Sequence, residues 1–102
     1  MSFIHEMHIS EIGITYPKDL GTKLYRINYY IKSFSPENQP YEFHQHHLAQ
    51  FTQVNISDMD FIEMSDEQAI SMIESTYSDT IQSQKSTAED ELNKMIIPVV
   101  EI

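Results

Sequence analysis

The spacing of apolar residues changes once along the chain, and this change most constrains the fold. From Phe3 to Ile56, apolar residues mostly alternate with polar ones, which is the period of a strand with one buried face. After Ser65 they recur every three or four residues, the period of an amphipathic helix. Sheet-forming sequence therefore precedes helix-forming sequence. This order predicts a single α+β domain over residues 1–102, an antiparallel sheet packed by one or two C-terminal helices.

Three strands are predicted in the first half. The first runs from Phe3 to Tyr16, and its apolar positions shift by one residue, which predicts a bulge near Gly13. The second runs from Lys23 to Phe34 and alternates regularly. Its apolar face holds Tyr25, Ile27, Tyr29 and Ile31. The third, from Tyr41 to Ile56, follows a proline-containing turn and forms a hairpin with the second. It changes phase near its end, which predicts a bend or bulge.

Two capping signals follow. Ser65 precedes two acids and then Gln68, the capping-box arrangement, so a helix is predicted to start there. Its apolar stripe consists of Ile70, Ile73, Tyr77 and Ile81. Ser86, with Glu89 three residues later, predicts a second helix after a break between residues 82 and 85; one broken helix is the alternative. Pro98 ends this helix, and residues 99–102 are a candidate fourth strand at the sheet edge.

Charge is divided unequally between the halves. The chain carries a formal net charge of −10 at pH 7. Residues 1–50 hold five acids and four bases, whereas residues 51–102 hold eleven acids and two bases. So large an excess either keeps the protein soluble or attracts a cationic partner. It disfavours direct binding of DNA or RNA, whose phosphates it would repel.

The acids are densest at the entry to the predicted helix, where five carboxylates and no base occur within ten residues. Part of this density is explained by the preference of acids for helix N-termini, and a merely solvated surface is one interpretation. The other is a binding face for a basic protein. Tyr30, beside Arg26 and Lys32, is a candidate aromatic contact. The predicted partner-binding residues are Asp58, Asp60, Glu63, Asp66, Glu67, Glu74 and Tyr30.

The leading functional hypothesis is a small, acidic, non-catalytic inhibitor or immunity-type protein. It would cover the basic, nucleic-acid-binding surface of a toxin, nuclease or other nucleic-acid enzyme. In composition the chain resembles toxin immunity, anti-restriction and anti-CRISPR proteins, which are small and acidic. No catalytic motif is present, and with only two glycines there is no glycine-rich phosphate loop, so neither an enzyme nor a cofactor is predicted.

One alternative is an oligomeric chaperone or peptide-binding module. Three long strands, a helix and a proline-containing tail are similar in order to the SecB export chaperones, with residues 41–55 as the matching long strand. If the helices cover only one face of the sheet, apolar residues on the other would favour a homodimer or a bound peptide. These residues are Leu24, Tyr30, Phe34 and Leu48.

A second alternative is a metal site made of histidines. His44 and His46 lie on one face of the third strand, and His8 would complete a ligand set only if the first and third strands are neighbours. The spacing is a weak signal. The chain contains no cysteine and no apolar run long enough to cross a membrane, so a cytoplasmic location with no membrane partner is expected.

Overall fold

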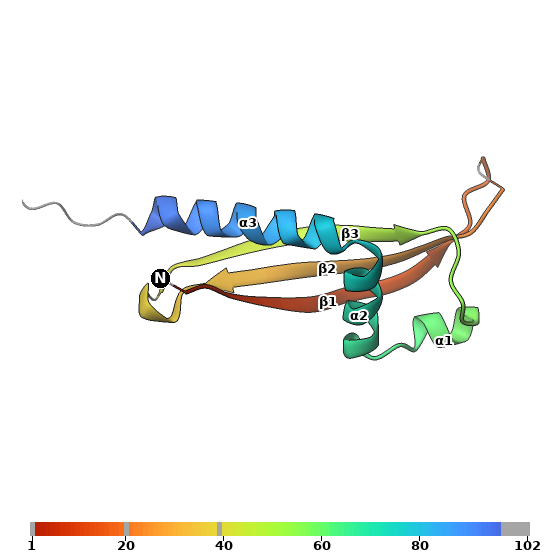
Figure 1. The fold of residues 1–102 in the computed structure, drawn as a ribbon. Helices are drawn as coiled ribbons and strands as arrows, with labels where there is room; N and C mark the ends of the chain where they lie inside the picture. The colour runs from red at the N-terminus through yellow and green to blue at the C-terminus, as the bar shows by residue number, and fades with distance from the viewer. Residues whose placement is uncertain (1, 20, 39, 97–102) are drawn as a thin grey trace, which may run out of the picture.

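A sheet of three antiparallel strands, in the order β1-β2-β3, forms the centre of the molecule (Figure 1). A computed structural model describes residues 2–19, 21–38 and 40–96. The strands are β1 (Ile4–Thr15), β2 (Leu24–Phe34) and β3 (Glu42–Phe51), with a 3-10 turn η1 (Pro36–Asn38). The helices are α1 (Asp58–Ile62), α2 (Asp66–Thr76) and α3 (Ser78–Met95). The predicted α+β class is confirmed; the candidate strand at residues 99–102 lies outside the described residues.

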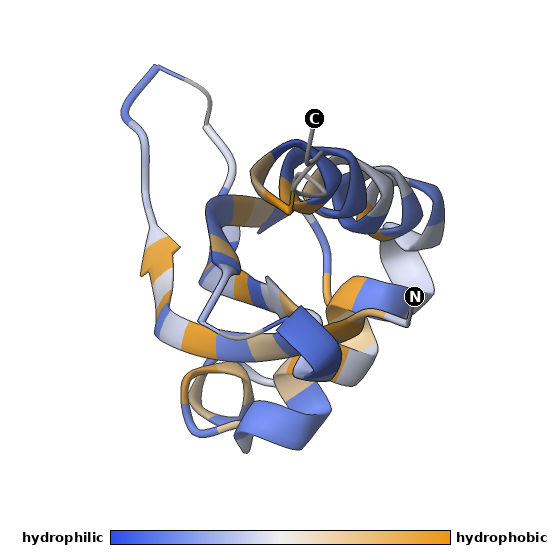
Figure 2. Ribbon diagram, turned by 90° about the vertical axis from the view of Figure 1, so that its left-hand side faces the viewer, coloured by the Kyte–Doolittle hydropathy of each residue, from blue (hydrophilic) through white to orange (hydrophobic). Residues whose placement is uncertain are grey.

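Strand β2 sets the position of the core because its residues alternate strictly between buried and half-buried. Tyr25 and Tyr29 are buried, as predicted, and pack with one side chain or more from each helix, including Phe61, Ile73 and Ile81. The three helices therefore cover the same face of the sheet. The other face carries the half-buried residues of β2, and alternating colours along the strands in Figure 2 follow this two-sided pattern. We call it the uncovered sheet face.

Two details of the strands differ from the prediction. The bulge lies between Ile9 and Glu11, because the apolar phase has already changed there. Gly13 is regularly paired with Arg26, and a Cβ at position 13 would lie 3.0 Å from the Arg26 Nη2 atom, so this glycine makes room for a guanidinium. Strand β3 pairs with β2 without any shift and ends at Phe51. The phase change that predicted a bulge in β3 falls beyond the strand.

The predicted helix boundaries are partly correct. The capping box at Ser65 is present, with both of its hydrogen bonds to Gln68. The predicted break near residues 82–85 is wrong, because α3 runs through Ser86 without interruption. Its buried residues Ile81, Ala88 and Leu92 keep one face against the sheet across that point. The chain instead breaks at Tyr77, which leaves helical geometry between α2 and α3. The five-residue α1 was not predicted.

The helices are distributed along an elongated molecule of about 64 × 27 × 20 Å. Figure 1 shows α3 running beside the sheet toward the end that holds η1, while α1 lies near the opposite end and α2 crosses between them. No helix in the described part of the chain is both long and apolar enough to span a membrane. The acidic segment predicted as a binding face is therefore concentrated toward one end, in α1 and α2.

Candidate functional site

Helix α1 begins at a capping residue and is fixed by one aromatic anchor. The Ser57 hydroxyl accepts a hydrogen bond from the Asp60 backbone N–H at 3.1 Å. Phe61 is fully buried and meets the Tyr25 ring edge-on, with the ring centroids 5.0 Å apart. Asp58 and Asp60 occupy the first helical turn, so helix capping explains part of the acidic cluster before Ser65 as well as the part after it.

Asp58 is the acid in this cluster that is bonded within the protein. Its carboxylate accepts hydrogen bonds from Lys23 Nζ at 3.0 and 3.2 Å, from Tyr25 Oη at 2.8 Å and from Tyr16 Oη at 3.4 Å. The Lys23 and Tyr25 bonds lower the pKa of Asp58, and the bond to Asp58 raises the pKa of Tyr25. Asp58 thus ties α1 to the start of β2, and its oxygens are already occupied.

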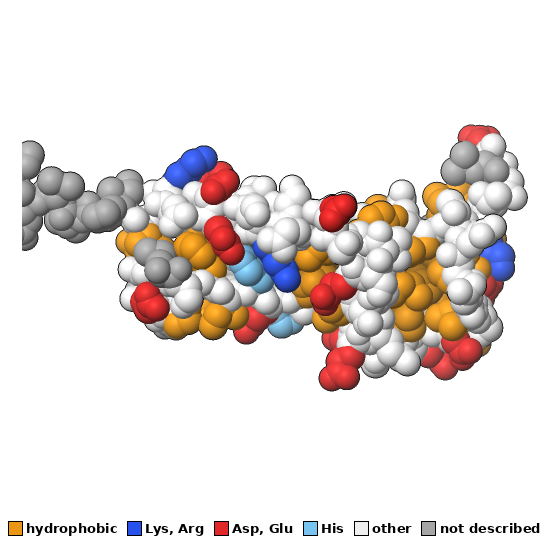
Figure 3. Space-filling model, in the orientation of Figure 1, with side chains coloured by type: hydrophobic (Ala, Val, Ile, Leu, Met, Phe, Trp, Pro, Cys, Tyr) orange, Lys and Arg blue, Asp and Glu red, His pale blue; other side chains and the backbone are white. Residues whose placement is uncertain are grey.

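The other predicted acids of α1 and α2 lack such partners. Glu63 caps the end of α1, while Asp66 and Glu67 lie in the first turn of α2. All are exposed, as is Glu74, and among the described residues none of them forms an ion pair. The same holds for Asp60. In Figure 3, acidic side chains (red) and hydrophobic ones (orange) lie next to one another over α1 and α2. Within residues 2–19, 21–38 and 40–96, Asp58 is therefore the one acid of α1 and α2 that has an ion-pair partner.

A hollow of about 450 Å³ lies between α1 and α2. We call it the α1–α2 groove, and it is lined by Ile56, Asp60, Glu63, Met64, Gln68 and Met72. Half of these side chains are apolar and two are carboxylates. Helix α1 also exposes 61% of Met59 and 49% of Ile62, which do not line the groove. Exposed large apolar side chains and acids on one short helix are typical of a protein-binding surface.

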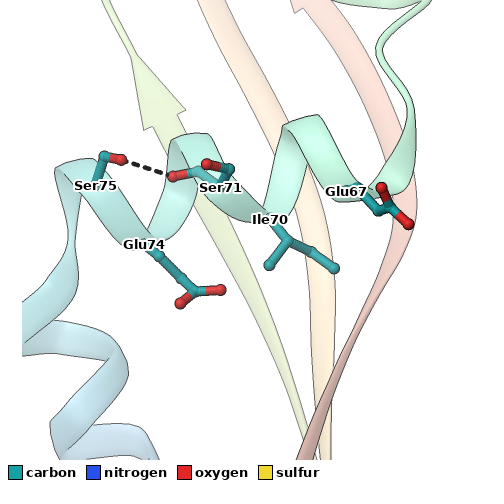
Figure 4. A pocket seen from close by; sticks show the side chains of 5 residues that line it. All are labelled: Glu67, Ile70, Ser71, Glu74 and Ser75. Carbon is teal, nitrogen blue, oxygen red and sulfur yellow. Dashed lines mark hydrogen bonds between the residues drawn. The ribbon is translucent and has the colours of Figure 1, made fainter.

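Glu74 lies on a different side of α2. It lines a second hollow, of about 510 Å³, together with Glu67 and Ile70. Figure 4 shows Ile70 and Glu74 projecting in the same direction, while the Ser75 hydroxyl donates to the Ser71 carbonyl oxygen at 2.8 Å. The second hollow has fewer large apolar side chains than the α1–α2 groove. Acidic residues thus flank α2 on both sides.

Tyr30 is not brought together with the acids. It projects from the uncovered sheet face, opposite the helices, where it stacks on His8 with the ring centroids 4.8 Å apart. On the β3 side its ring centroid lies 5.5 Å from that of His46 and 6.4 Å from that of His44. Strand β2 separates His8 from the other two, so the condition for a shared metal site is not met. No three metal-binding side chains gather within residues 2–19, 21–38 and 40–96.

Charges on the uncovered sheet face are paired, both between neighbouring strands and within β3. Arg26 Nη2 lies 3.4 Å from Glu11 Oε1, and Lys32 Nζ lies 3.6 Å from Glu42 Oε1. His44 Nε2 lies 2.9 Å from Glu42 Oε2, and this hydrogen bond is the main cause of a lowered pKa at Glu42.

The apolar residues predicted for this face are present but separated. Leu24, Tyr30 and Phe34 alternate along β2 with charged and amide side chains, and Leu48 pairs with Asn28. None of the four is the direct cross-strand partner of another. The face is uncovered, as the homodimer hypothesis required, yet these four residues do not by themselves form a continuous patch. Phe34 pairs instead with Ile4 of β1, which is 41% exposed.

One chain of polar contacts was not predicted from the sequence. His5 Nδ1 lies 2.7 Å from Ser33 Oγ, and His5 Nε2 lies 2.8 Å from Glu89 Oε2. A serine, a histidine and an acid in line resemble a nucleophilic relay, but Ser33 is fully buried, so its hydroxyl is closed to any substrate in this conformation. The chain of contacts holds α3 on β1 and β2. No spacing signal could reveal it, since His5 and Glu89 are 84 residues apart.

Comparison with protein-family models, with curated proteins and with solved structures finds no match for this chain. The class that its own fold defines is α+β, with an antiparallel sheet covered on one face by helices. The similarity to SecB chaperones rests on the order of the elements alone. Function must therefore be argued from the surface of this molecule.

Proposed function

We propose that this protein is a small, acidic, non-catalytic binding protein of the inhibitor or immunity type. Its α1–α2 end covers a basic, nucleic-acid-binding surface of a toxin, nuclease or other nucleic-acid enzyme. A single observation carries the proposal: the acids of α1 and α2 other than Asp58 are exposed and form no ion pair in the described part of the chain, whereas Glu11 and Glu42 on the uncovered sheet face are paired. Within this type, the candidate classes are toxin immunity, anti-restriction and anti-CRISPR proteins.

Unpaired exposed acids favour this role for a physical reason. They produce a negative potential that is not cancelled locally, and such a potential accelerates encounter with a positively charged surface. The same carboxylates can occupy the positions that nucleic-acid phosphates would take, so partner and nucleic acid would compete. Because exposed charges are screened by salt, binding should weaken as ionic strength rises. The partners that we propose act in the cytoplasm, and we place the protein there as part of the same proposal.

The proposal is tested by capture from native lysate at low and high salt. Three immobilised proteins are compared: the wild type, the Asp60→Lys/Glu63→Lys variant, and the Glu37→Lys/Asp90→Lys variant. The last is a matched control, because it changes the net charge equally at exposed positions away from α1 and α2. Proteins retained at low salt are identified by mass spectrometry. Each is then expressed, purified and titrated individually.

We expect the wild type and the control variant to retain a basic nucleic-acid-binding protein at low salt. The Asp60→Lys/Glu63→Lys variant should lose it, with an affinity at least about 10-fold lower in the purified titration, since two charge reversals typically cost more than 1.4 kcal/mol. Equal loss in both variants would mean that only net charge matters. Retention unaffected by salt and by both pairs of reversals would overturn the proposal.

The chaperone or homodimer alternative has less support. It required a continuous apolar patch on the uncovered sheet face, and the relevant residues are interrupted by Arg26, Asn28 and Lys32. A metal-binding role has less support still, because β2 stands between His8 and His46. Neither alternative gains a specific observation from the fold, so we carry only the acidic binding protein forward.

A further inference from the structure

We infer that the α1–α2 groove binds a basic amphipathic helix, whose apolar side chains enter the hollow and whose lysines or arginines meet the acidic rim. The inference rests on the proposed function, because it specifies which part of a basic partner makes the contact. It adds that apolar side chains of the partner enter the groove, so that affinity does not depend on charge alone.

The lining of the groove favours an apolar insert. Ile56, Met64 and Met72 present aliphatic and thioether surface to a hollow of about 450 Å³. Methionine is unbranched and polarizable, so two methionines can adapt to side chains of different shape. Ile56 is 37% exposed and the neighbouring Met59 61%, so apolar surface remains to be removed from water. A free-standing acidic surface without such a lining would attract cations without selecting among them.

The acids that line the groove determine which kind of apolar helix can bind there. Asp60 and Glu63 line the groove, and neither forms an ion pair with another described residue. An acidic or neutral apolar helix would leave these carboxylates desolvated and unpaired, which is unfavourable. A helix with apolar residues three and four apart and basic residues beside them satisfies both the lining and the rim.

A second copy of this chain does not suit the groove. In a symmetric pair each copy would bring its own acidic α1 and α2 segments toward those of the other, and the whole chain holds only six bases against sixteen acids. Like charges placed opposite one another oppose association. Nucleic acid is disfavoured for the same reason. The occupant that the charges allow is therefore a segment of a different, basic protein.

The inference is tested with two synthetic peptides of about 18 residues. One is an amphipathic leucine–lysine helix; the other has the same number of lysines with serine in place of leucine. Fluorescence anisotropy of labelled peptide gives the affinity for the wild type and two variants. Ile56→Ser alters the groove, and Leu48→Ser is the matched control, since Leu48 is a 51% exposed aliphatic residue on the uncovered sheet face. Circular dichroism checks that both variants remain folded.

We expect the leucine–lysine peptide to bind the wild type and Leu48→Ser equally, and Ile56→Ser about five-fold more weakly, the effect of losing roughly 1 kcal/mol of apolar burial. Three results would overturn the inference: no binding of this peptide, equal binding of both peptides, or equal affinity of all three proteins. Dimerisation that is lost in Ile56→Ser would also overturn it, since a second copy would then occupy the groove.

A different set of results would contradict the proposed function. It is contradicted if binding of both peptides is independent of salt and of the Asp60→Lys/Glu63→Lys change. If both peptides bind equally but respond to salt and to those reversals, the acidic surface attracts basic partners without using the groove. In that case the inference fails and the proposed function stands.

Discussion

The α1–α2 end and the uncovered sheet face are both exposed and both rich in acids, yet they differ in how those charges are used. On the sheet, Glu11 and Glu42 form ion pairs with Arg26 and Lys32, which lie diagonally across from them on the neighbouring strand. At the α1–α2 end, Asp60 and Glu63 line a partly apolar hollow, and neither forms an ion pair with another described residue. Acid content alone therefore does not distinguish the two regions. The pairing of the acids does, because a paired charge produces little field beyond its partner.

The largest effect is expected at Phe61, whose buried ring anchors α1 against Tyr25. Phe61→Ala removes a fully buried ring, so we expect the free energy of unfolding to fall by about 3–5 kcal/mol. Urea denaturation followed by circular dichroism measures the loss. Met59→Ala on the same helix is the control and should change stability by less than about 0.5 kcal/mol, because that side chain is mostly exposed. Equal effects would mean that α1 is not held by Phe61.

A smaller effect is expected at the start of α2, where Ser65 caps the helix that contributes Gln68 and Met72 to the groove. Ser65→Ala removes one half of the capping box and should cost about 1 kcal/mol in urea denaturation. Ser71→Ala, at an exposed position within the same helix, should be close to neutral. If the two variants have the same stability, the capping box contributes nothing measurable to α2.

Asp58 gives a pH-dependent test. Its pKa is lowered from the ordinary value of 3.8 by Lys23 and Tyr25, so the ionised form stabilises the folded state. This contribution is fully present above the unfolded pKa and is lost as the pH falls through the lower, folded pKa. Asp58→Asn should therefore be less stable than the wild type at neutral pH, and the difference should vanish in acid. Parallel urea titrations over that range measure it; a difference independent of pH would contradict the assignment.

The smallest effect is expected on the uncovered sheet face. Tyr30→Ala removes a ring that stacks on His8 but lies on the opposite side of the sheet from the helices. We expect its affinity for the leucine–lysine peptide and for a captured partner to equal that of the wild type. Isothermal titration calorimetry is a suitable measurement. A loss of more than about three-fold, corresponding to roughly 0.7 kcal/mol, would show that the sheet face takes part in binding.

Local patterns predicted much of the fold. Alternation identified β2 and its core tyrosines, and the Ser65 capping signal located the start of α2, because both depend on neighbouring residues. The continuity of α3 at Ser86 depends instead on packing against the sheet, which overrides a capping signal. Helix α1 escaped prediction because five residues are too few to show a helical period.

The candidate site was predicted less completely, because long-range contacts decide it. The acidic segment was visible in the sequence, but Asp58 pairs with Lys23 from 35 residues away, which removes one acid from the unpaired set. The apolar lining of the groove contains Ile56, Met64 and Met72. These residues lie close together only because the chain turns between α1 and α2. Tyr30 was grouped with the acids, yet the sheet places it on the other face.

The most direct test of the account is a map of backbone amide NMR shifts in the protein titrated with the leucine–lysine peptide. It reports on both regions in one experiment and requires no substitution. We predict shifts concentrated in residues 56–72, with the amides of β1 and β3 unchanged. Shifts concentrated on the strands, or spread evenly over the molecule, would contradict the claim that the unpaired acids and the groove between α1 and α2 form the binding surface.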